Sequence, residues 1–194
     1  LSQYDVEIFA EIVDAPMVKI EKILERAEKY RRDGANVIDI GCLPDTPFPH
    51  LEDTIQALHD RGFKVSIDSL EENDLLRGGR AGADYLLSLK ESMLWIAEEV
   101  ASVPILIPET HGDMSSLYRA IENFSKKDLL FYADVILDPI HFGFTKSIIR
   151  YHELRQNCPD IKIMMGVGNL TELTEADTTG INAMLFGLIS EMQL

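Results

Sequence analysis

The 194-residue chain has few cysteines, few basic residues and no long apolar run. Two cysteines, Cys42 and Cys158, are too few for a disulfide scaffold and favour a reducing, cytoplasmic location. Eighteen basic against 33 acidic side chains give a net charge of −15, which argues against a nucleic-acid partner. No apolar run approaches the roughly 20 residues that a membrane span needs.

The sequence also lacks the short signatures of several enzyme classes. It has no nucleophile elbow, no phosphate-binding P-loop and no glycine pattern for a dinucleotide. Its five histidines form no close pair at ligand spacing, and the one cation site to weigh groups His111 with Glu109 and Asp113. Cys42 has no Cys-x-x-Cys partner, so we interpret it as a packing residue rather than a nucleophile.

The chain does have a regular alternation of short apolar runs with amphipathic stretches. A hydrophobic content of 46% is enough for one domain with a sizeable core. Short runs rich in Ile, Val, Leu and Met are typical of strands buried on both faces. Eight such runs occur, at residues 6–13, 37–41, 63–68, 85–89, 103–108, 135–138, 161–167 and 181–188.

Apolar residues recur at helical spacing between these runs, for example before Gly34 and before Gly62. Eight strands that mostly alternate with helices predict an α/β fold, a (β/α)8 TIM barrel, in preference to an open doubly wound sheet. Only residues 189–194 follow the eighth run, which predicts a truncated or missing eighth helix. We expect a single barrel domain over residues 1–194, excised from a longer chain because the first residue is Leu.

Polar side chains follow several of the expected strands. Asp39, Asp68 and Asp138 each end an apolar run, and Asn169 follows another. Strand ends of this kind meet at the active-site face of a barrel. One aspartate there commonly caps the next helix, but three together favour a ligand, because a buried carboxylate costs free energy unless it is paired. A carboxylate can accept two N–H bonds from a flat amidine-like ring edge, such as that of guanine or a pterin.

Segments in chain order resemble the pterin-binding superfamily, typified by dihydropteroate synthase. They are residues 33–41 (DGANVIDIG), 65–69 (VSIDS), 82–86 (GADYL), 138–139 (DP) and 143–146 (GFTK). The resemblance implies that Asp39, Asp68 and Asp138 line a pterin pocket. It also implies that Asp138 accepts two N–H bonds from the pterin amino edge, and that Lys146 lies near the ring carbonyl or orders its loop. Residues 166–174 (GVGNLTELT) are similar to dihydropteroate synthase-related proteins linked to methanopterin-type biosynthesis.

Parts of the synthase pattern are absent. Residues 11–16 (EIVDAP) replace the loop Asn-x-Thr-x-Asp-Ser-Phe after the first strand. Leu87 and Ser88 stand where synthases have Asn-Asp, neither residue after Gly168 is basic, and an arginine-histidine pair after strand eight is missing. Departure of a diphosphate needs positive charge or Mg²⁺. The pattern therefore argues against ordinary condensation of a pterin diphosphate with 4-aminobenzoate.

Three functions stay open on this basis. One is a dihydropteroate synthase-like transferase of folate or methanopterin-type biosynthesis, with Mg²⁺ as a cofactor if a diphosphate is used. Another is a methyl-pterin methyltransferase of the corrinoid-linked branch, in which Asn169 would hydrogen-bond the pterin near its methylated nitrogen. The third is a pterin-binding domain without catalysis. Besides the pterin, we expect a homodimer or contact with the rest of a longer chain, because strand eight would lack a covering helix.

Overall fold

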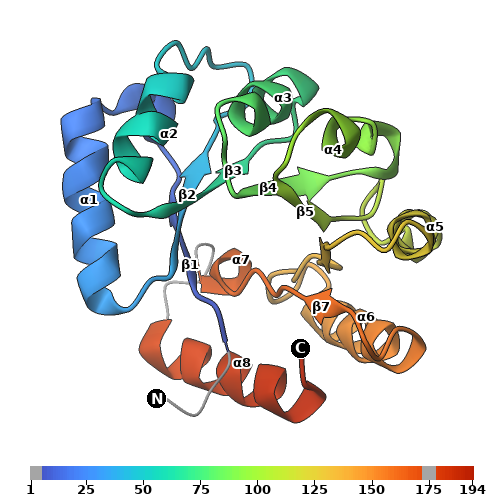
Figure 1. Ribbon diagram of the computed structural model, residues 1–194. Helices are drawn as coiled ribbons and strands as arrows, with labels where there is room; N and C mark the ends of the chain where they lie inside the picture. The colour runs from blue at the N-terminus through green and yellow to red at the C-terminus, as the bar shows by residue number, and fades with distance from the viewer. Residues whose placement is uncertain (1–5, 172–177) are drawn as a thin grey trace. The chain divides into compact units, whose positions relative to one another are not determined.

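The computed structural model describes residues 6–171 and 178–194. These residues form an α/β fold in which seven strands follow one another in chain order, with helices between them (Figure 1). They group into two compact units, Leu1–Leu89 with Met93–Pro104 and Lys90–Ser92 with Ile105–Leu194, and each unit is described by itself.

The first unit is built on four parallel strands, β1 (Phe9–Ile12), β2 (Val37–Gly41), β3 (Lys64–Asp68) and β4 (Tyr85–Leu89). Each strand pairs with the next in parallel register; Glu11 lies opposite Asp39, and Gly41 lies opposite Asp68. β2 is buried along its whole length, and β3 and β4 are largely buried. The expectation of strands covered on both faces is confirmed for these three.

Helices cover the strands of this unit. They are α1 (Ile20–Asp33), α2 (Leu51–His59), α3 (Glu72–Arg80) and α4 (Ile96–Glu99), with a short 3₁₀ turn, η1, at Ala15–Met17. α1 and α2 pack side by side, and both α2 and α3 contact β3 (Figure 1). Gly34 follows α1 with φ 110° and Gly62 follows α2 with φ 73°. Both glycines end helices in the left-handed region, as their positions in the sequence predicted.

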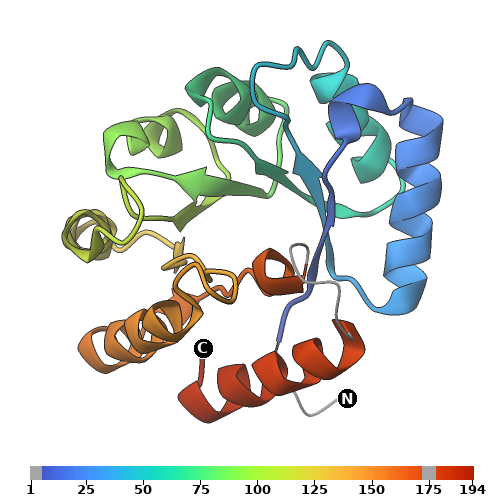
Figure 2. The same ribbon diagram turned by 180° about the vertical axis from the view of Figure 1, so that it is seen from behind.

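The second unit carries shorter strands and longer helices. Its elements are β5 (Val103–Leu106, shared with the first unit), α5 (Met114–Lys126), β6 (Tyr132–Ala133), α6 (Phe144–Asn157), β7 (Lys162–Ile163), α7 (Gly168–Thr171) and α8 (Thr178–Met192), with a 3₁₀ turn, η2, at Glu91–Met93. β6 pairs in parallel with β5 and with β7. The orange helix α6 lies alongside β7 in both views (Figures 1 and 2).

Two of the expected strands are wrong in this unit. Residues 135–138 are not a regular strand, because Ile136 has φ 66° and interrupts the extended run. Residues 181–188 belong to α8, and the described residues contain no eighth strand. The expectation of a truncated or missing eighth helix is wrong as well, since α8 is 15 residues long. A short run that is apolar all round cannot be assigned to strand or helix by periodicity alone.

Apolar side chains from strands and helices form the core of each unit. In the first unit, Ile40 and Ile67 from the strands are buried with Leu58 from α2. In the second, Leu117 from α5 and Leu154 from α6 are fully buried. Among the described residues, no helix combines the length and apolar character required to cross a membrane.

Candidate functional site

Three carboxylates converge at the carboxyl ends of the first three strands. Glu11 on β1 lies directly opposite Asp39 on β2, and Asp68 lies two residues beyond the β3 residue that faces Asp39. Side chains two residues apart in a strand point to the same face. One oxygen from each of the three carboxylates accordingly lies within 4.8 Å of the other two. Strand register brings Asp39 and Asp68 together and adds Glu11 to them.

Serine hydroxyls orient the two aspartates of this cluster. Ser66 Oγ donates to Asp39 Oδ1 at 2.6 Å, and Ser88 Oγ donates to Asp68 Oδ1 at 2.7 Å. Ser88 has φ 67°, a left-handed conformation that is uncommon for a residue with a Cβ and is found most often at functional sites. Each carboxylate is thus held by a neutral donor that leaves its charge uncompensated.

Burial and the neighbouring negative charges change how the two aspartates ionise. Burial raises the pKa of the Asp39 carboxyl well above its usual range, and the negative charges of Asp68 and Glu11 raise this pKa further, against the hydrogen bond from Ser66. Burial also raises the pKa of the Asp68 carboxyl, with the Ser88 hydrogen bond acting in the opposite direction. Neighbouring carboxylates that cannot all ionise hold a proton between them.

The cluster can therefore be neutralised in two ways. It can keep a proton and donate as well as accept hydrogen bonds, or it can bind a hard divalent cation such as Mg²⁺, which prefers carboxylate oxygens. The sequence predicted no metal site, and Glu11 was not among the expected site residues. The available signal was a glutamate inside the apolar run at residues 6–13, on a strand expected to be buried on both faces.

Gly41 and Cys42 lie next to the cluster, and their surroundings restrict what each can do. A Cβ added to Gly41 would fall 2.5 Å from Glu11 Oε1 and 3.0 Å from the backbone Cα of Val13, so a larger residue here would crowd both the carboxylate and the neighbouring backbone. Burial raises the pKa of the neighbouring Cys42 thiol to about 12. A thiol that stays protonated at neutral pH is a poor nucleophile, which supports the interpretation of Cys42 as a packing residue.

A second polar cluster follows β6 in the other unit. The chain leaves the strand direction at Ile136, whose N–H donates to Asp134 Oδ1 at 2.7 Å. The same oxygen accepts the Tyr151 hydroxyl from α6 at 2.5 Å. Arg150, also on α6, donates to the Ile136 carbonyl at 3.1 Å. These side chains replace the strand hydrogen bonds that the left-handed residue gives up.

Asp138 is buried at the end of this segment, and both of its carboxylate oxygens have partners. Arg150 Nη2 donates to Oδ2 at 2.9 Å, and His111 Nε2 lies 3.3 Å from Oδ1. The Asp138 N–H donates to Ser147 Oγ at 3.0 Å. A Cβ on Gly143, whose φ is 128°, would lie 2.7 Å from Oδ2, so the carboxylate rests against this glycine.

The other two expected site residues lie in the same unit as Asp138. Asn169, at the start of α7, donates from Nδ2 to the carbonyl of Leu137 at 3.2 Å, which places its amide next to the segment that carries Asp138. Lys146 lies on the first turn of α6, is exposed, and has no hydrogen bond or ion pair among the described residues. Of the segment 166–174 that resembles synthase-related proteins, residues 172–174 lie outside the described residues.

The cation site weighed around His111 is not formed. Asp113 accepts the backbone N–H groups of Ser115 and Ser116 and caps the N-terminus of α5. Glu109 accepts both the N–H and the hydroxyl of Ser92 at 2.9 Å. The two carboxylates are therefore used for local structure, and His111 contacts Asp138 instead.

The structure thus unites Asp39 with Asp68 in one unit and Asp138 with Asn169 in the other.

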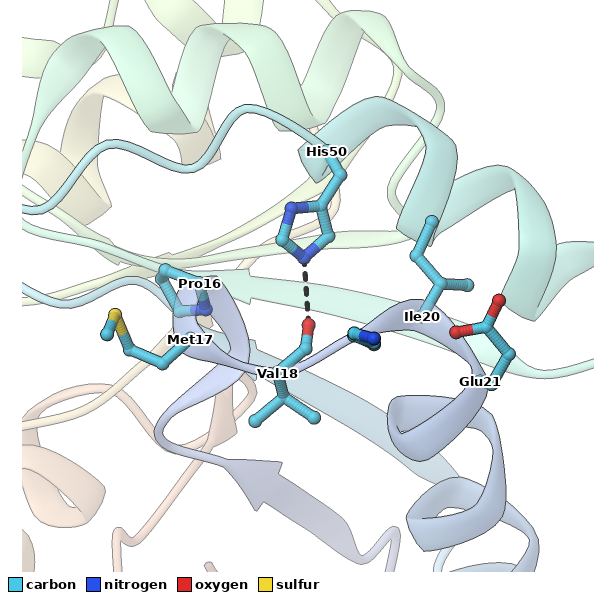
Figure 3. Close-up of a pocket in the computed structure, with 7 residues that line it drawn as sticks. Pro16, Met17, Val18, Ile20, Glu21 and His50 are labelled. Carbon is cyan, nitrogen blue, oxygen red and sulfur yellow. Dashed lines mark hydrogen bonds between the residues drawn. The ribbon is translucent and has the colours of Figure 1, made fainter.

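A separate open cavity of about 340 Å³ lies beside η1, at the start of α1 and α2 (Figure 3). His50 spans it, with Nε2 2.9 Å from the carbonyl of Val18. The cavity is lined by residues 16–21 and His50, and none of the expected site residues is among them.

Comparisons with known sequences identify one informative relative. A scan against models of protein families finds no match for the chain. The chain is 28% identical over 210 residues to the uncharacterized protein MJ0107 of Methanocaldococcus jannaschii. The alignment covers 98% of this chain and 40% of that protein, so the chain spans well under half the length of this relative.

Solved structures of dihydropteroate synthases share the fold. The enzyme from Vibrio fischeri ES114 matches with a TM-score of 0.68 at 16% identity, over 94% of this chain and 81% of that one. The Anaplasma phagocytophilum enzyme, with bound 6-hydroxymethylpterin-monophosphate, gives 0.67 at 13% identity over 96% and 89%. The Coxiella burnetii enzyme, in complex with pteroic acid, gives 0.68 at 16% identity over 95% and 81%. The chain therefore shares the α/β, TIM-barrel-type fold of these synthases, which confirms the fold class that the alternation of strands and helices predicted.

Proposed function

We propose that the chain is a pterin-binding domain that acts as a dihydropteroate synthase-like transferase in folate or methanopterin-type biosynthesis. The observation that carries the proposal is the set of buried or largely buried carboxylates on the strands or after them, Asp39 and Asp68 in one unit and Asp138 in the other. They occur in a fold shared with synthases, one of which was solved with a pterin monophosphate. The residues that we propose for pterin binding are Asp39 and Asp68 in the first unit, and Asp138, Lys146 and Asn169 in the second.

The ionisation of the carboxylates suits a pterin edge. Such an edge presents N–H donors beside a ring carbonyl or ring nitrogen, so its partners must include both acceptors and a donor. The cluster of Glu11, Asp39 and Asp68 offers both, because burial and mutual repulsion favour a retained proton on Asp39. In the other unit, Asp138 offers a carboxylate acceptor that already pairs with Arg150, and charge-assisted hydrogen bonds are the stronger ones.

Group transfer from a pterin diphosphate also requires positive charge near the leaving group. Asn169 and Leu170, at the start of α7, provide none. Mg²⁺ bound by Glu11, Asp39 and Asp68 in place of the retained proton would supply it, because the donor set is entirely carboxylate oxygen. We expect millimolar MgCl₂ to raise the Tm of the wild-type protein and to leave the Tm of Asp68→Asn unchanged. If MgCl₂ shifts the Tm of the wild type and of Asp68→Asn equally, both with and without inorganic diphosphate, Mg²⁺ is removed from the proposal.

Calorimetric titration with 6-hydroxymethylpterin tests the proposal directly. Asp138→Asn should weaken binding by about 1.5–3 kcal/mol, roughly tenfold or more, because the amide has one acceptor oxygen and no charge. The same change deprives Arg150 of its carboxylate, so titrations belong at a temperature where circular dichroism shows the variant folded. Asp53→Asn, on the exposed side of α2, is the matched control and should bind like wild type. No heat of binding in the wild-type protein would refute the proposal.

Asn169 favours one second candidate, a methyl-pterin methyltransferase. Its Nδ2 is engaged by the Leu137 carbonyl, which fixes the amide beside the segment of Asp138. This role needs no phosphate cradle. Thermal shift separates the candidates: a ligand at a hundred times its Kd adds about 2.7 kcal/mol, or several degrees in Tm. A shift with a methylated tetrahydropterin but not with 6-hydroxymethylpterin would favour the methyltransferase. Binding without turnover of either would favour a domain without catalysis.

A further inference from the structure

The two partners of Asp138 differ in how firmly they hold it. Arg150 is a permanent partner: its side chain is 13% exposed, and the nitrogen that meets Asp138 Oδ2 at 2.9 Å also donates to the Ile136 carbonyl. His111 is a weak partner: its side chain is 58% exposed, and its Nε2 lies 3.3 Å from Oδ1. A distance of 2.7–2.9 Å is usual for a strong charge-assisted bond.

The loop that carries His111 can move the imidazole without disturbing the helix behind it. Gly112, the next residue, has φ 76° and open space around its Cβ position. Asp113 then caps α5 through Ser115 and Ser116, so the helix start is fixed independently of His111. Swinging the histidine away costs one long, solvent-exposed contact, and such contacts contribute little to stability.

His111 also occupies the position that a ligand would need. Asp138 is 7% exposed at its side chain, Arg150 fills the side of Oδ2, and the imidazole stands at Oδ1. Because the Asp138 side chain is almost fully buried, an N–H donor arriving at Oδ1 competes with His111 Nε2 for the same small opening. We infer that His111 is the exchangeable occupant of the ligand-binding oxygen of Asp138, and that a pterin N–H takes its place while Arg150 stays. This inference rests on the proposed function.

The exchange has a kinetic signature. A competing side chain lowers the fraction of protein that is open to the ligand, and the apparent affinity falls by that fraction. Removing the imidazole in His111→Ala should raise the association rate constant for 6-hydroxymethylpterin about two- to fivefold, the range expected for the loss of one long contact from an exposed side chain. The dissociation rate constant should stay unchanged, because His111 does not hold the bound pterin.

Stopped-flow measurement of pterin fluorescence gives both rate constants. His152→Ala is the matched control, since His152 is an exposed histidine on α6 without a partner among the described residues, and should leave both unchanged. In an Asp138→Asn background the effect of His111→Ala should disappear. An unchanged association rate, or a faster dissociation in His111→Ala, would overturn the inference while leaving pterin binding intact. Absence of pterin binding in the wild type and in His111→Ala would overturn the proposed function and the inference together.

Discussion

Asp39 carries the largest electrostatic cost among the residues expected to form the site. It is buried beside Asp68 and Glu11, and it accepts a hydrogen bond from the neutral hydroxyl of Ser66. Because the pKa of Asp39 is raised in the folded chain, the proton it keeps stabilises the fold at low pH. That contribution is complete below the pKa of the unfolded chain and is lost as the pH rises through the folded-state pKa.

Asp39→Asn should therefore stabilise the protein in a pH-dependent way. The amide oxygen can still accept from Ser66, and no charge has to be buried. We expect the free energy of unfolding in urea to rise by about 1–3 kcal/mol at pH 8 and to change little at pH 4. Asp53→Asn, at an exposed position, should show no such pH dependence. A loss of stability at pH 8 would mean that the ionised carboxylate has a partner that compensates its charge.

Tyr151 supports the segment that leads to Asp138. Its hydroxyl donates to Asp134 Oδ1, the oxygen that also holds the N–H of Ile136. Tyr151→Phe should cost about 1–3 kcal/mol in urea denaturation, because a buried carboxylate loses a donor. Tyr118→Phe removes a hydroxyl that accepts from Asn157 at an exposed contact and should cost about 0.5 kcal/mol or less. Equal effects of the two changes would show that the Asp134 contact contributes nothing special.

At the scale of elements, burial on both faces decided which strands could be predicted. β2 and β4 begin and end where their apolar runs do, and β3 differs by one residue at its start. Asp39 and Asp68 were found because they are carboxylates in such runs, Asp39 in the middle of its run and Asp68 at the end. Glu11 was not found, because its place opposite Asp39 depends on the register of β1 against β2, and this register cannot be read from either run.

The second unit was predicted less well, for a local reason. Ile136 is β-branched and still adopts a positive φ, held by Asp134 and Arg150, and no propensity anticipates this. The contacts of His111 and Arg150 with Asp138 join residues far apart in sequence, so they were equally invisible. α8 was taken for a strand because its residues are apolar on most sides.

α8 offers a direct test of its helical assignment. Gly187 lies within it, is exposed, and has nothing within 4 Å of a Cβ position. Gly187→Ala should raise the free energy of unfolding by about 0.5–1 kcal/mol, because alanine has the higher helix propensity and nothing obstructs its methyl group. Gly143→Ala is the opposite case, since its Cβ would meet Asp138 at a positive φ, and it should destabilise the protein. Destabilisation by Gly187→Ala would contradict an exposed helical position.

At the scale of the whole molecule, a homodimer stays a prediction, but the structure gives a different reason to expect it. The uncovered strand that first suggested it is part of α8. α8 instead exposes Met184 at 75% and Phe186 at 37%, apolar surface that a second copy could cover, and two-fold dimers are the commonest assembly. Light scattering should give twice the mass of 21.9 kDa at micromolar concentration, and Met184→Glu should lower it. A mass of one chain at every concentration would exclude the dimer.

The net charge of −15 affects the stability of the whole fold, because like charges repel one another in both the folded and the unfolded chain. Crowded like charges repel in the compact state more than in the unfolded chain, so screening them should stabilise the fold. The Debye length falls from about 30 Å at 0.01 M salt to about 3 Å at 1 M. Exposed ion pairs such as Arg77 with Glu52 weaken over the same range, but each contributes only about 0–1 kcal/mol. We therefore expect Tm at pH 8 to rise by a few degrees with KCl, measured in EDTA to exclude divalent cations. Near pH 4.6, where the net charge vanishes, the same salt should leave Tm unchanged or lower it. A fall in Tm with salt at pH 8 would mean that specific ion pairs outweigh the general repulsion.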